Sequence, residues 1–382
     1  MNSLRSANGA HYHDEWVLRS ILIGLLHPDR IIPNEYEEFI KHRFQNPKWI
    51  GFLRTSGLYS FICYHLKKNR QADQTLIYDG LNAHFANTGK AIMMDRIVLE
   101  LSDLFQSEKI KLVLTKGYIL SRDYYCHVGC RPYGDLDFWI DPSHREKACQ
   151  LLLSNGWTAY HSSGSAWKEH ATFNHPGWKQ LIELHWELIG LYGSSPLLRL
   201  DTDRFSPAYF RYTRINNQMV ATFIPEIHYL HAMINWIRKG GWPPLKYLDL
   251  YFIRPHCRSE ILDRIIHSRE LKGLVGYMER EIQFYFGASR LQLRKPPLLS
   301  VVKTFRVPGD RQKLRLRYYL TSDRIRLMYD LFRMLIPSMD FLTLYYGSGR
   351  CYRSMMVEWW KEKGIKFFHR SGHSGGVSWP HR

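Results

Sequence analysis

The chain has 382 residues, 45% of them hydrophobic, and is long enough to bury a sizeable core in more than one lobe. Its 53 basic and 35 acidic residues give a net charge of +18, which favours anionic partners such as nucleoside triphosphates, phosphorylated acceptors or RNA. No apolar run approaches the roughly twenty residues of a membrane span. Six scattered cysteines, with no second pair at zinc-finger spacing beside Cys126 and Cys130, indicate reduced thiols. We therefore expect a cytoplasmic protein without a membrane segment.

Apolar residues at helical spacing dominate both ends of the chain. Residues 11–105 indicate a series of helices, the longest expected over 83–105, and the pattern becomes helical again from Pro225. Glycines and polar residues fill the last segment, which is typical of disorder. The predicted organisation is a helical N-terminal region at residues 1–107, a core at 108–215, a helical C-terminal domain at 216–369 and a disordered tail at 370–382.

Strand and helix patterns alternate through the predicted core, which favours an α/β (α+β) fold with a small mixed sheet. One helix is expected from Tyr118 to about His127. Another is expected to begin at Ser143, its N-cap, and to run to Asn155, with Gly156 ending it. The expected strands cover residues 111–117, 135–140, 157–160, 171–174 and 180–186.

Two carboxylates stand two residues apart in the sequence Gly-Asp-Leu-Asp-Phe-Trp-Ile. In a strand, Asp135 and Asp137 point to the same face. Two neighbouring anions are unfavourable unless a positive charge lies between them, and a divalent metal is the obvious candidate. We therefore predict that Asp135 and Asp137 bind Mg²⁺, with Mn²⁺ as a possible substitute.

The strand before this motif ends in Lys116 and Gly117, directly before a predicted helix. Backbone N–H groups at the start of that helix, together with the ammonium of Lys116, would suit a triphosphate. The order of strand, Lys-Gly turn, helix and second strand brings this phosphate cradle next to the paired aspartates. We therefore predict that Lys116, Gly117 and Gly134 contact the nucleotide.

A third acid comes from the last predicted strand, where Glu183 and His185 share one face and apolar side chains share the other. If this strand pairs beside the first two, Glu183 completes a site of three carboxylates for one or two magnesium ions. Glu183 would then act as the general base that takes a proton from an acceptor hydroxyl. We interpret His185 as a core or supporting histidine rather than as a metal ligand.

Three motifs in this order, Leu-x-Lys-Gly, Arg-x-x-Gly-Asp-Leu-Asp and Glu-Leu-His-Trp, resemble an uncharacterised nucleotidyltransferase family within the polymerase-beta-like superfamily. The resemblance covers roughly residues 50–365, with its specific motifs in the core. It implies transfer of a nucleoside monophosphate from a nucleoside triphosphate such as ATP to an acceptor hydroxyl, with release of pyrophosphate. The acceptor class stays open between small molecules, peptides and RNA.

Two features depart from the wider superfamily, which usually carries Gly-Ser where this chain has Lys116-Gly117. Residues 118–134, seventeen in number, separate Gly117 from Asp135. This spacing is longer than the superfamily norm and usual for the family. Both departures leave the metal ligands in place, and they bear on how the β- and γ-phosphates are held.

Three further nucleotide-binding candidates each have two interpretations. The planar fork of Arg131 would suit phosphate, or it would anchor its own loop to backbone carbonyls. Lys246 and Asp249 are three residues apart on an expected helix, which favours a salt bridge on one helix face. The resemblance implies instead that both line the nucleotide cleft.

Two alternatives to nucleotidyl transfer stay open. The same metal cluster would serve attack at the γ-phosphorus, which defines a phosphotransferase. Residues 294–333 carry eleven basic and three acidic residues, so the chain could also be a non-catalytic RNA-binding or partner-binding module on a degenerate transferase fold. A solvated helical surface explains the same charges.

Overall fold

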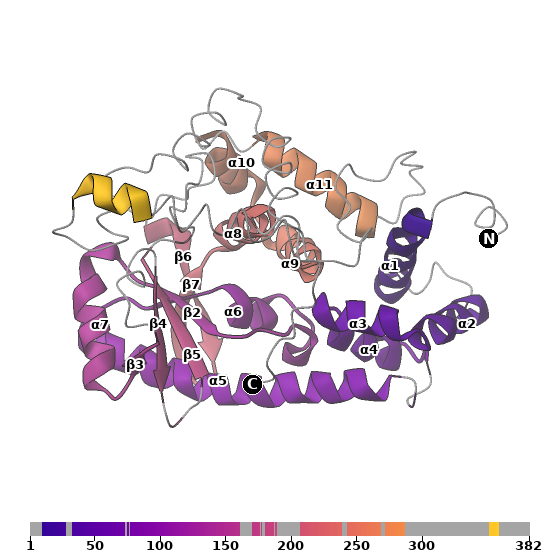
Figure 1. Cartoon of the computed structure of the whole chain (residues 1–382), viewed down its shortest axis with the longest axis horizontal. Coiled ribbons are helices and arrows are strands. Elements are labelled where there is room, and N and C mark those ends of the chain that lie inside the picture. The colour runs from indigo at the N-terminus through magenta and orange to yellow at the C-terminus, as the bar shows by residue number, and fades with distance from the viewer. Residues whose placement is uncertain are drawn as a thin grey trace.

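Helices surround a seven-stranded mixed sheet in the computed structural model (Figure 1). The predicted α/β class is thereby confirmed. The basic stretch at 294–333 and the predicted tail at 370–382 lie outside the residues that the structure describes. Those are residues 10–27, 33–72, 75, 77–160, 170–175, 177, 180–186, 188, 207–238, 243–268, 272–286 and 351–358.

The sheet has the strand order β3-β4-β5-β2-β1-β7-β6. Its centre is mixed, because β2 runs antiparallel to β1 and parallel to β5, whereas β1 runs parallel to β7. All five expected strands are confirmed, although several are shorter than expected. The strands are β1 (Val113–Thr115), β2 (Leu136–Trp139), β3 (Thr158–Ala159), β4 (His170–His175), β5 (Gln180–His185), β6 (Phe210–Ile215) and β7 (Gln218–Phe223).

A hairpin carries the sheet beyond the core boundary predicted at residue 215. β6 and β7 pair with Ile215 opposite Gln218, so the turn between them has two residues. Asn216 adopts a φ of 51°, in the left-handed region that such turns require and that asparagine tolerates. The sheet therefore continues to Phe223, and the last helical layer begins after it.

The helices form layers on both sides of this sheet. In Figure 1, α5 lies beneath the sheet and beneath α3 and α4, whereas α8 to α11 lie on the opposite side of the sheet. The N-terminal helices are α1 (Ala10–Leu26), α2 (Pro33–Phe44), α3 (Pro47–Thr55), α4 (Tyr59–Lys68) and α5 (Tyr78–Ser107). The later helices are α6 (Lys116–Asp123), α7 (Arg145–Ser154), α8 (Pro225–Arg238), α9 (Leu245–Ile253), α10 (Ser259–Ser268) and α11 (Lys272–Phe286).

Two core helices differ from the sequence expectation. α6 begins at Lys116, directly after β1, and ends at Asp123, four residues earlier than expected. Before α7, residues 142–144 form a short 3₁₀ turn, and the side chain of Asp141 accepts a hydrogen bond from the Ser143 amide at 2.9 Å. Asp141 is therefore the capping residue here, although Ser143 was the predicted cap.

The two faces of the sheet bury different hydrophobic sets. Phe138 and Leu184 lie on the face that packs with residues of α5 and α7. Trp139 and Phe223 belong to the core formed with α8 and α9. Because side chains alternate along a strand, Asp137 lies on the same face as Trp139, under the layer of α8 and α9.

Helix α5 contacts the loop before β2, helix α6 and strand β7. Lys90 Nζ donates a hydrogen bond to the carbonyl of Tyr133 at 3.0 Å, in the loop before β2. Asp95 accepts a hydrogen bond from the Tyr118 hydroxyl of α6 at 2.6 Å. Asp103 accepts one from β7 at 2.8 Å. One straight element of 30 residues thus aligns the loop, the helix and the strand.

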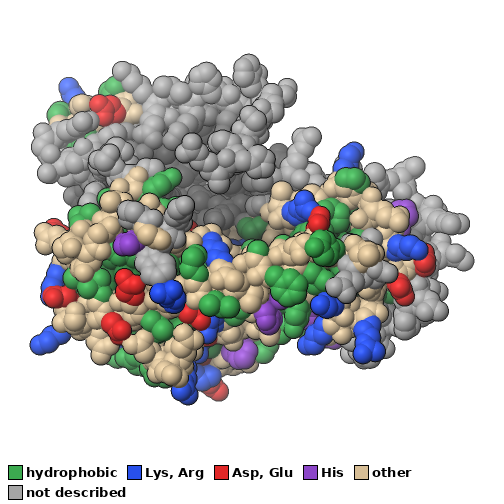
Figure 2. All heavy atoms as spheres, turned by 90° about the horizontal axis from the view of Figure 1, so that it is seen from below, with side chains coloured by type: hydrophobic (Ala, Val, Ile, Leu, Met, Phe, Trp, Pro, Cys, Tyr) green, Lys and Arg blue, Asp and Glu red, His purple; other side chains and the backbone are tan. Residues whose placement is uncertain are grey.

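Within the described part of the chain, no helix is both long enough and apolar enough to cross a membrane. Figure 2 shows one face of the molecule, on which Lys and Arg side chains are spread among hydrophobic and acidic ones. The charge of the described surface on this face is therefore mixed.

We expect Phe138→Ala to destabilise the protein strongly, because Phe138 is 1% exposed at the centre of the sheet. Truncation of a buried aromatic side chain costs about 3–5 kcal/mol. Tyr212→Ala is the matched control, since Tyr212 is 59% exposed on the edge strand β6, and surface changes stay within about 0.5 kcal/mol. Denaturant unfolding measures both, and equal losses would contradict this packing.

Candidate active site

Strand pairing brings the predicted acids together from separate segments. In the parallel pairing of β2 with β5, Asp137 lies opposite Glu183. Side chains at opposed positions point to the same face, and His185 follows two residues later on that face. On the other side of β2, Thr115 of β1 lies opposite Asp137, and the next residue is Lys116.

The side chains of these four residues meet at one point. Lys116 Nζ donates to Asp137 Oδ1 at 2.5 Å and lies 2.8 Å from His185 Nε2 and 3.6 Å from Glu183 Oε2. His185 Nε2 in turn lies 3.0 Å from Asp137 Oδ1 and 3.1 Å from Glu183 Oε2. The potential ligand atoms of Asp137, Glu183 and His185 all lie within 4.8 Å of one another.

The ammonium of Lys116 thus lies where a bound cation would be expected. Two carboxylates and an imidazole nitrogen surround it, and an ammonium supplies the positive charge that a divalent metal would otherwise supply. The donor set also fits a metal, because carboxylate oxygens are the ligands that Mg²⁺ and Mn²⁺ prefer, and imidazole is a common ligand of transition metals. Asp137 and Glu183 would hold such an ion.

The backbone of Lys116 is strained in a way that helps to place its side chain. Its φ is 57°, in the left-handed region. This conformation costs a residue with a side chain roughly 1–2 kcal/mol, whereas glycine adopts it freely. The ion pairs with Asp137 and Glu183 compensate for the strain, which is a pattern common at functional sites.

Electrostatics keep the paired acids charged and leave Asp135 different from them. Burial alone would raise the pKa of Asp137, but Lys116 and His185 outweigh it and hold the pKa well below its usual range. The pKa of Glu183 is also lowered, because its hydrogen bond with His185 and the charge of Lys116 outweigh burial and Asp137. By contrast, burial and then Asp137 and Glu183 raise the pKa of Asp135.

Asp135 lies just before β2, in the loop that leads to it, and is partly exposed. It stands outside the group whose potential ligand atoms lie within 4.8 Å of one another, although its carboxylate interacts electrostatically with Asp137, Glu183 and Lys116. The backbone beside it is fixed, since the carbonyl of Gly134 accepts hydrogen bonds from Lys90 Nζ at 2.8 Å and from a side chain of β5 at 2.9 Å.

Arg131 and Asp249 form a fully buried bidentate pair. Arg131 Nε donates to Asp249 Oδ1 at 2.6 Å, and Nη2 donates to Oδ2 at 2.8 Å. Arg131 Nη1 also donates to the carbonyl of Gly117 at 3.0 Å. Asp249 further accepts a hydrogen bond from the Tyr125 hydroxyl at 2.8 Å, and Lys246 Nζ lies 3.5 Å from its Oδ2.

These contacts describe an anchor between the loop before β2 and helix α9. The fork of Arg131 engages Asp249 and a backbone carbonyl, as in the loop-anchoring interpretation. Lys246 and Asp249 form the salt bridge that their spacing predicts. These residues hold the loop before β2 against α9.

The two predicted glycines differ in their surroundings. A Cβ atom on Gly117 would approach the Tyr133 Cβ to 2.7 Å and the Arg131 guanidinium to 3.2 Å, so this turn of α6 requires glycine for close packing. A Cβ on Gly134 would meet no atom within 4 Å. Gly117 is thus tightly packed against Arg131 and Tyr133, whereas Gly134 is exposed.

Two histidines near the acids were not predicted as site residues. His185 enters the cluster, and its place two residues after Glu183 on one strand face was the signal for it. His231 of α8 is buried, and its pKa is lowered far below the usual value by burial and then by Lys116 and Lys246. Nothing in the sequence around His231 indicated this proximity.

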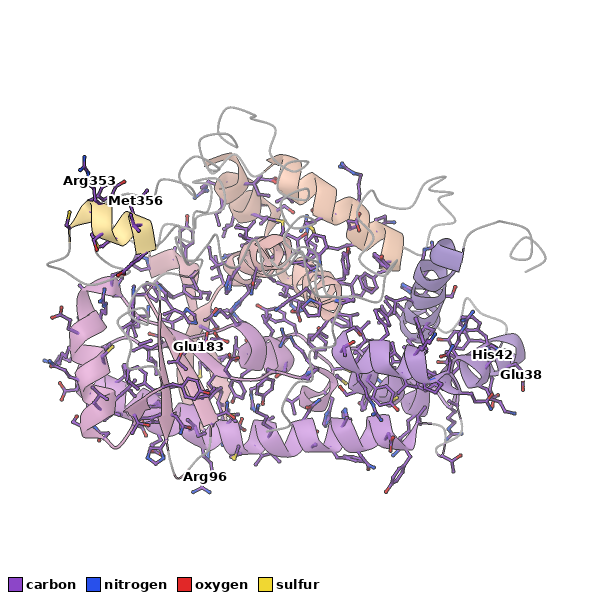
Figure 3. The ribbon with its side chains drawn as sticks, viewed as in Figure 1. Glu38, His42, Arg96, Glu183, Arg353 and Met356 are labelled. Carbon is purple, nitrogen blue, oxygen red and sulfur yellow. The ribbon has the colours of Figure 1, made fainter. Side chains whose placement is uncertain are left out.

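Figure 3 places Glu183 in the body of the molecule, on the sheet, whereas Glu38 and His42 lie at the outer end of the N-terminal helices and Arg96 lies on α5. The strand register thus brings Asp137 and Glu183 together beside the start of α6.

Comparison with known proteins specifies the family. Residues 44–253, more than half of the chain, match the family described as uncharacterised nucleotidyltransferase, and the chain belongs to this family. The resemblance of the sequence motifs is thereby confirmed. No curated protein matches the sequence.

Two crystal structures are similar to part of the chain. One is an antigenic nucleotidyltransferase-like protein from Paracoccidioides brasiliensis, with 18% identity over 48% of this chain and 91% of the other, and a TM-score of 0.32. The other is the lincosamide antibiotic adenylyltransferase LnuA bound to lincomycin, with 15% identity over 42% of this chain and 95% of the other, and a TM-score of 0.28.

We expect Asp249→Asn to lower the free energy of unfolding by about 3–5 kcal/mol, because it leaves the Arg131 charge buried without its partner. Asp79→Asn is the control, since the Arg54–Asp79 pair is exposed and such pairs contribute about 0–1 kcal/mol. Burial would raise the pKa of Asp249, but Arg131 and Lys246 outweigh it and lower that pKa.

The pH dependence of this difference follows from the lowered pKa. The stabilisation by Asp249 is complete above its unfolded-state pKa of about 4 and is lost as the pH falls through the lower folded-state value. Denaturant unfolding from pH 7 down to pH 3 measures the difference between the free energies of unfolding of wild type and Asp249→Asn. A difference that grows toward acid pH would contradict the ion pair.

Proposed function

We propose that the protein is a metal-dependent nucleotidyltransferase that moves a nucleoside monophosphate from a nucleoside triphosphate such as ATP to an acceptor hydroxyl, with release of pyrophosphate. The observation that carries this proposal is the meeting of Asp137, Glu183 and Lys116 at one point of the sheet. Family membership supports nucleotidyl transfer in general.

The acids have different roles in this proposal. Asp137 and Glu183 hold Mg²⁺ or Mn²⁺, and Asp135 adds a third carboxylate from the adjoining loop. The ion, when bound, would neutralise phosphate charge and polarise the α-phosphoryl group. Because Asp137 and Glu183 have lowered pKa values, they are deprotonated at neutral pH and present full negative charge to the cation.

Glu183 is the carboxylate that we assign to proton acceptance. Its side chain is 25% exposed, whereas that of Asp137 is 4% exposed, so Glu183 is the member of the pair that an acceptor hydroxyl could reach. A general base must come within hydrogen-bond reach of the proton that it removes. Asp137, buried against Lys116 and His185, is the better fixed ligand.

Lys116 and the start of α6 serve the triphosphate. The pKa of Lys116 is raised, because Asp137 and Glu183 outweigh the lowering effect of burial, so it is positively charged at neutral pH. Lys116 is the first residue of α6, where backbone N–H groups have no partner within the helix, and such groups together with an ammonium suit phosphate oxygens. The start of α6 is held against α9 and the loop before β2 by the contacts among Gly117, Arg131, Lys246 and Asp249.

We expect Asp137→Asn and Glu183→Gln each to reduce transfer by at least about 10²–10³-fold, as the loss of one preorganised electrostatic group typically does. Glu38→Gln is the control, because Glu38 is an exposed glutamate on α2, distant from the sheet (Figure 3). Circular dichroism of all three variants checks that they fold. Full activity in the two site variants would remove the proposed role of these acids.

The label position on the nucleotide identifies the reaction. We incubate the full-length protein with α-labelled or γ-labelled triphosphates and a fractionated cell extract, and we assay pyrophosphate in parallel. Label from the α position in a product, with pyrophosphate release, is the expected result. Transfer of the γ label would indicate a phosphotransferase. RNA binding that persists in an Asp135→Ala, Asp137→Ala double variant, without any transfer, would favour the non-catalytic module.

Lys116→Met provides a test of the shared cation position. Removal of the ammonium leaves Asp137 and Glu183 with uncompensated charge, so nucleotide-free protein should bind Mn²⁺ more tightly, by roughly tenfold, which corresponds to about 1.4 kcal/mol. Transfer should nevertheless fall, because the phosphate contact is lost. Titration of Mn²⁺ followed by electron paramagnetic resonance measures the affinity, with Lys41→Met as control, because Lys41 is an exposed lysine on α2. Weaker Mn²⁺ binding in Lys116→Met would contradict the shared position.

A further inference from the structure

A second cluster of metal-binding side chains lies where α4, α5 and the loop after α6 meet. His65 Nε2 of α4 lies 3.5 Å from Cys126 Sγ. The potential ligand atoms of His65, Cys126 and Cys130 all lie within 4.8 Å of one another. Cys130 Sγ lies 4.0 Å from His84 Nδ1 of α5. This cluster shares no residue with the acid site.

The two nitrogen-to-sulfur distances in the cluster can be compared with those around a tetrahedral zinc ion. Zinc bonds of about 2.3 Å to sulfur and about 2.05 Å to nitrogen place a ligand nitrogen about 3.6 Å from a ligand sulfur. The distance between His65 and Cys126 agrees with this value. The distance between Cys130 and His84 is longer by about 0.4 Å, and His84 stands outside the three residues whose potential ligand atoms all lie within 4.8 Å of one another.

The chain fixes the position of this cluster through its backbone. A Cβ on Gly129 would come within 2.5 Å of the His84 carbonyl oxygen, so only glycine lets the loop lie this close to α5. Asn87 Nδ2 donates to the Gly129 carbonyl at 3.2 Å. His127 Nδ1 accepts a hydrogen bond from the Gly129 amide at 3.2 Å. Cys130, which is fully buried, is therefore held beside His84.

The donor atoms of the cluster indicate which metal ion it would bind. Two thiols and two imidazoles form the Cys₂His₂ composition of structural zinc sites, whereas magnesium and calcium prefer oxygen ligands. His65 and His84 are 9% and 3% exposed, so their nitrogens are withdrawn from bulk water beside these thiols.

We propose that His65, His84, Cys126 and Cys130 bind one zinc ion. Four protein ligands leave no open coordination position, so the ion has a structural role. Cys126 is exposed and marks the side from which the ion enters. The ion would join α4, α5 and the loop that leads to β2.

This site would position the loop on which the acid site depends. Arg131, which pairs with Asp249, is the residue directly after Cys130. A zinc bond to Cys130 therefore restrains the Arg131 anchor and, through it, the approach to Asp135. We expect zinc to affect the stability of this loop without taking part in group transfer.

The test uses untagged full-length protein, since a histidine tag would itself bind metal. Inductively coupled plasma mass spectrometry of wild type, after dialysis in metal-free buffer, should find about one zinc ion per chain. Cys126→Ser should lose this zinc, because it removes an exposed ligand with little effect on packing. Cys351→Ser, which replaces another exposed thiol outside the cluster, should retain it.

A second measurement covers protein from which zinc was lost during purification. One Co²⁺ per chain should bind to wild type and Cys351→Ser and produce a thiolate-to-cobalt charge-transfer band, which Cys126→Ser should lack. Absence of both zinc and this band from wild type would overturn the proposal, as would a thiolate-to-cobalt band of equal strength in Cys126→Ser. Intact mass under non-reducing conditions that shows a disulfide between Cys126 and Cys130 in freshly purified protein would also overturn it.

Discussion

Two carboxylates that strand pairing holds side by side require a positive charge between them, and this requirement organises the centre of the molecule. The register of β2 with β5 places Asp137 opposite Glu183, so their repulsion is built into the backbone. The ammonium of Lys116, the residue directly after β1, offsets this repulsion. The backbone of Lys116 has a left-handed φ, which is unfavourable for a residue with a side chain. Because an ammonium and a divalent cation satisfy the same two acids, the proposed catalytic state and the nucleotide-free state differ in which cation is present.

The Arg131–Asp249 pair joins the two halves of the fold. Its partners are 118 residues apart in sequence and both are buried, so neither charge is stable without the other. A buried pair of this kind adds little net stability over a hydrophobic contact, but it strongly disfavours any other docking of α9 on the loop before β2. The layer of α8 and α9 is therefore placed over the acid face by charge matching as well as by its apolar surface.

The sequence predicted local features of the site better than distant contacts. Asp135, Asp137 and Glu183 were predicted because strand alternation is visible in a few residues, and their convergence depended on which strands pair. The pairing of Arg131 with Asp249 and the approach of His231 bring together segments that share no local pattern.

Elements with weak local signals were also missed. The extension of the sheet through β7 was not predicted, although Asn216 in a two-residue turn was a usable signal. Cys126 and Cys130 were seen as a pair without partners, because the histidines beside them come from two helices far earlier in the chain. In both cases, tertiary context supplies information that spacing alone does not contain.

Because α5 is one continuous helix, the direction in which each of its side chains points is fixed relative to all the others. Its contacts with the loop before β2, with α6 and with β7 follow one another from Lys90 to Asp103, along about 20 Å of a single helix. Each residue added or removed within it would rotate everything beyond that point by about 100° and shift it by about 1.5 Å. Side-chain replacements along α5 perturb single contacts, but a change in its length would misalign all later ones together, so its residue count is constrained more tightly than its composition.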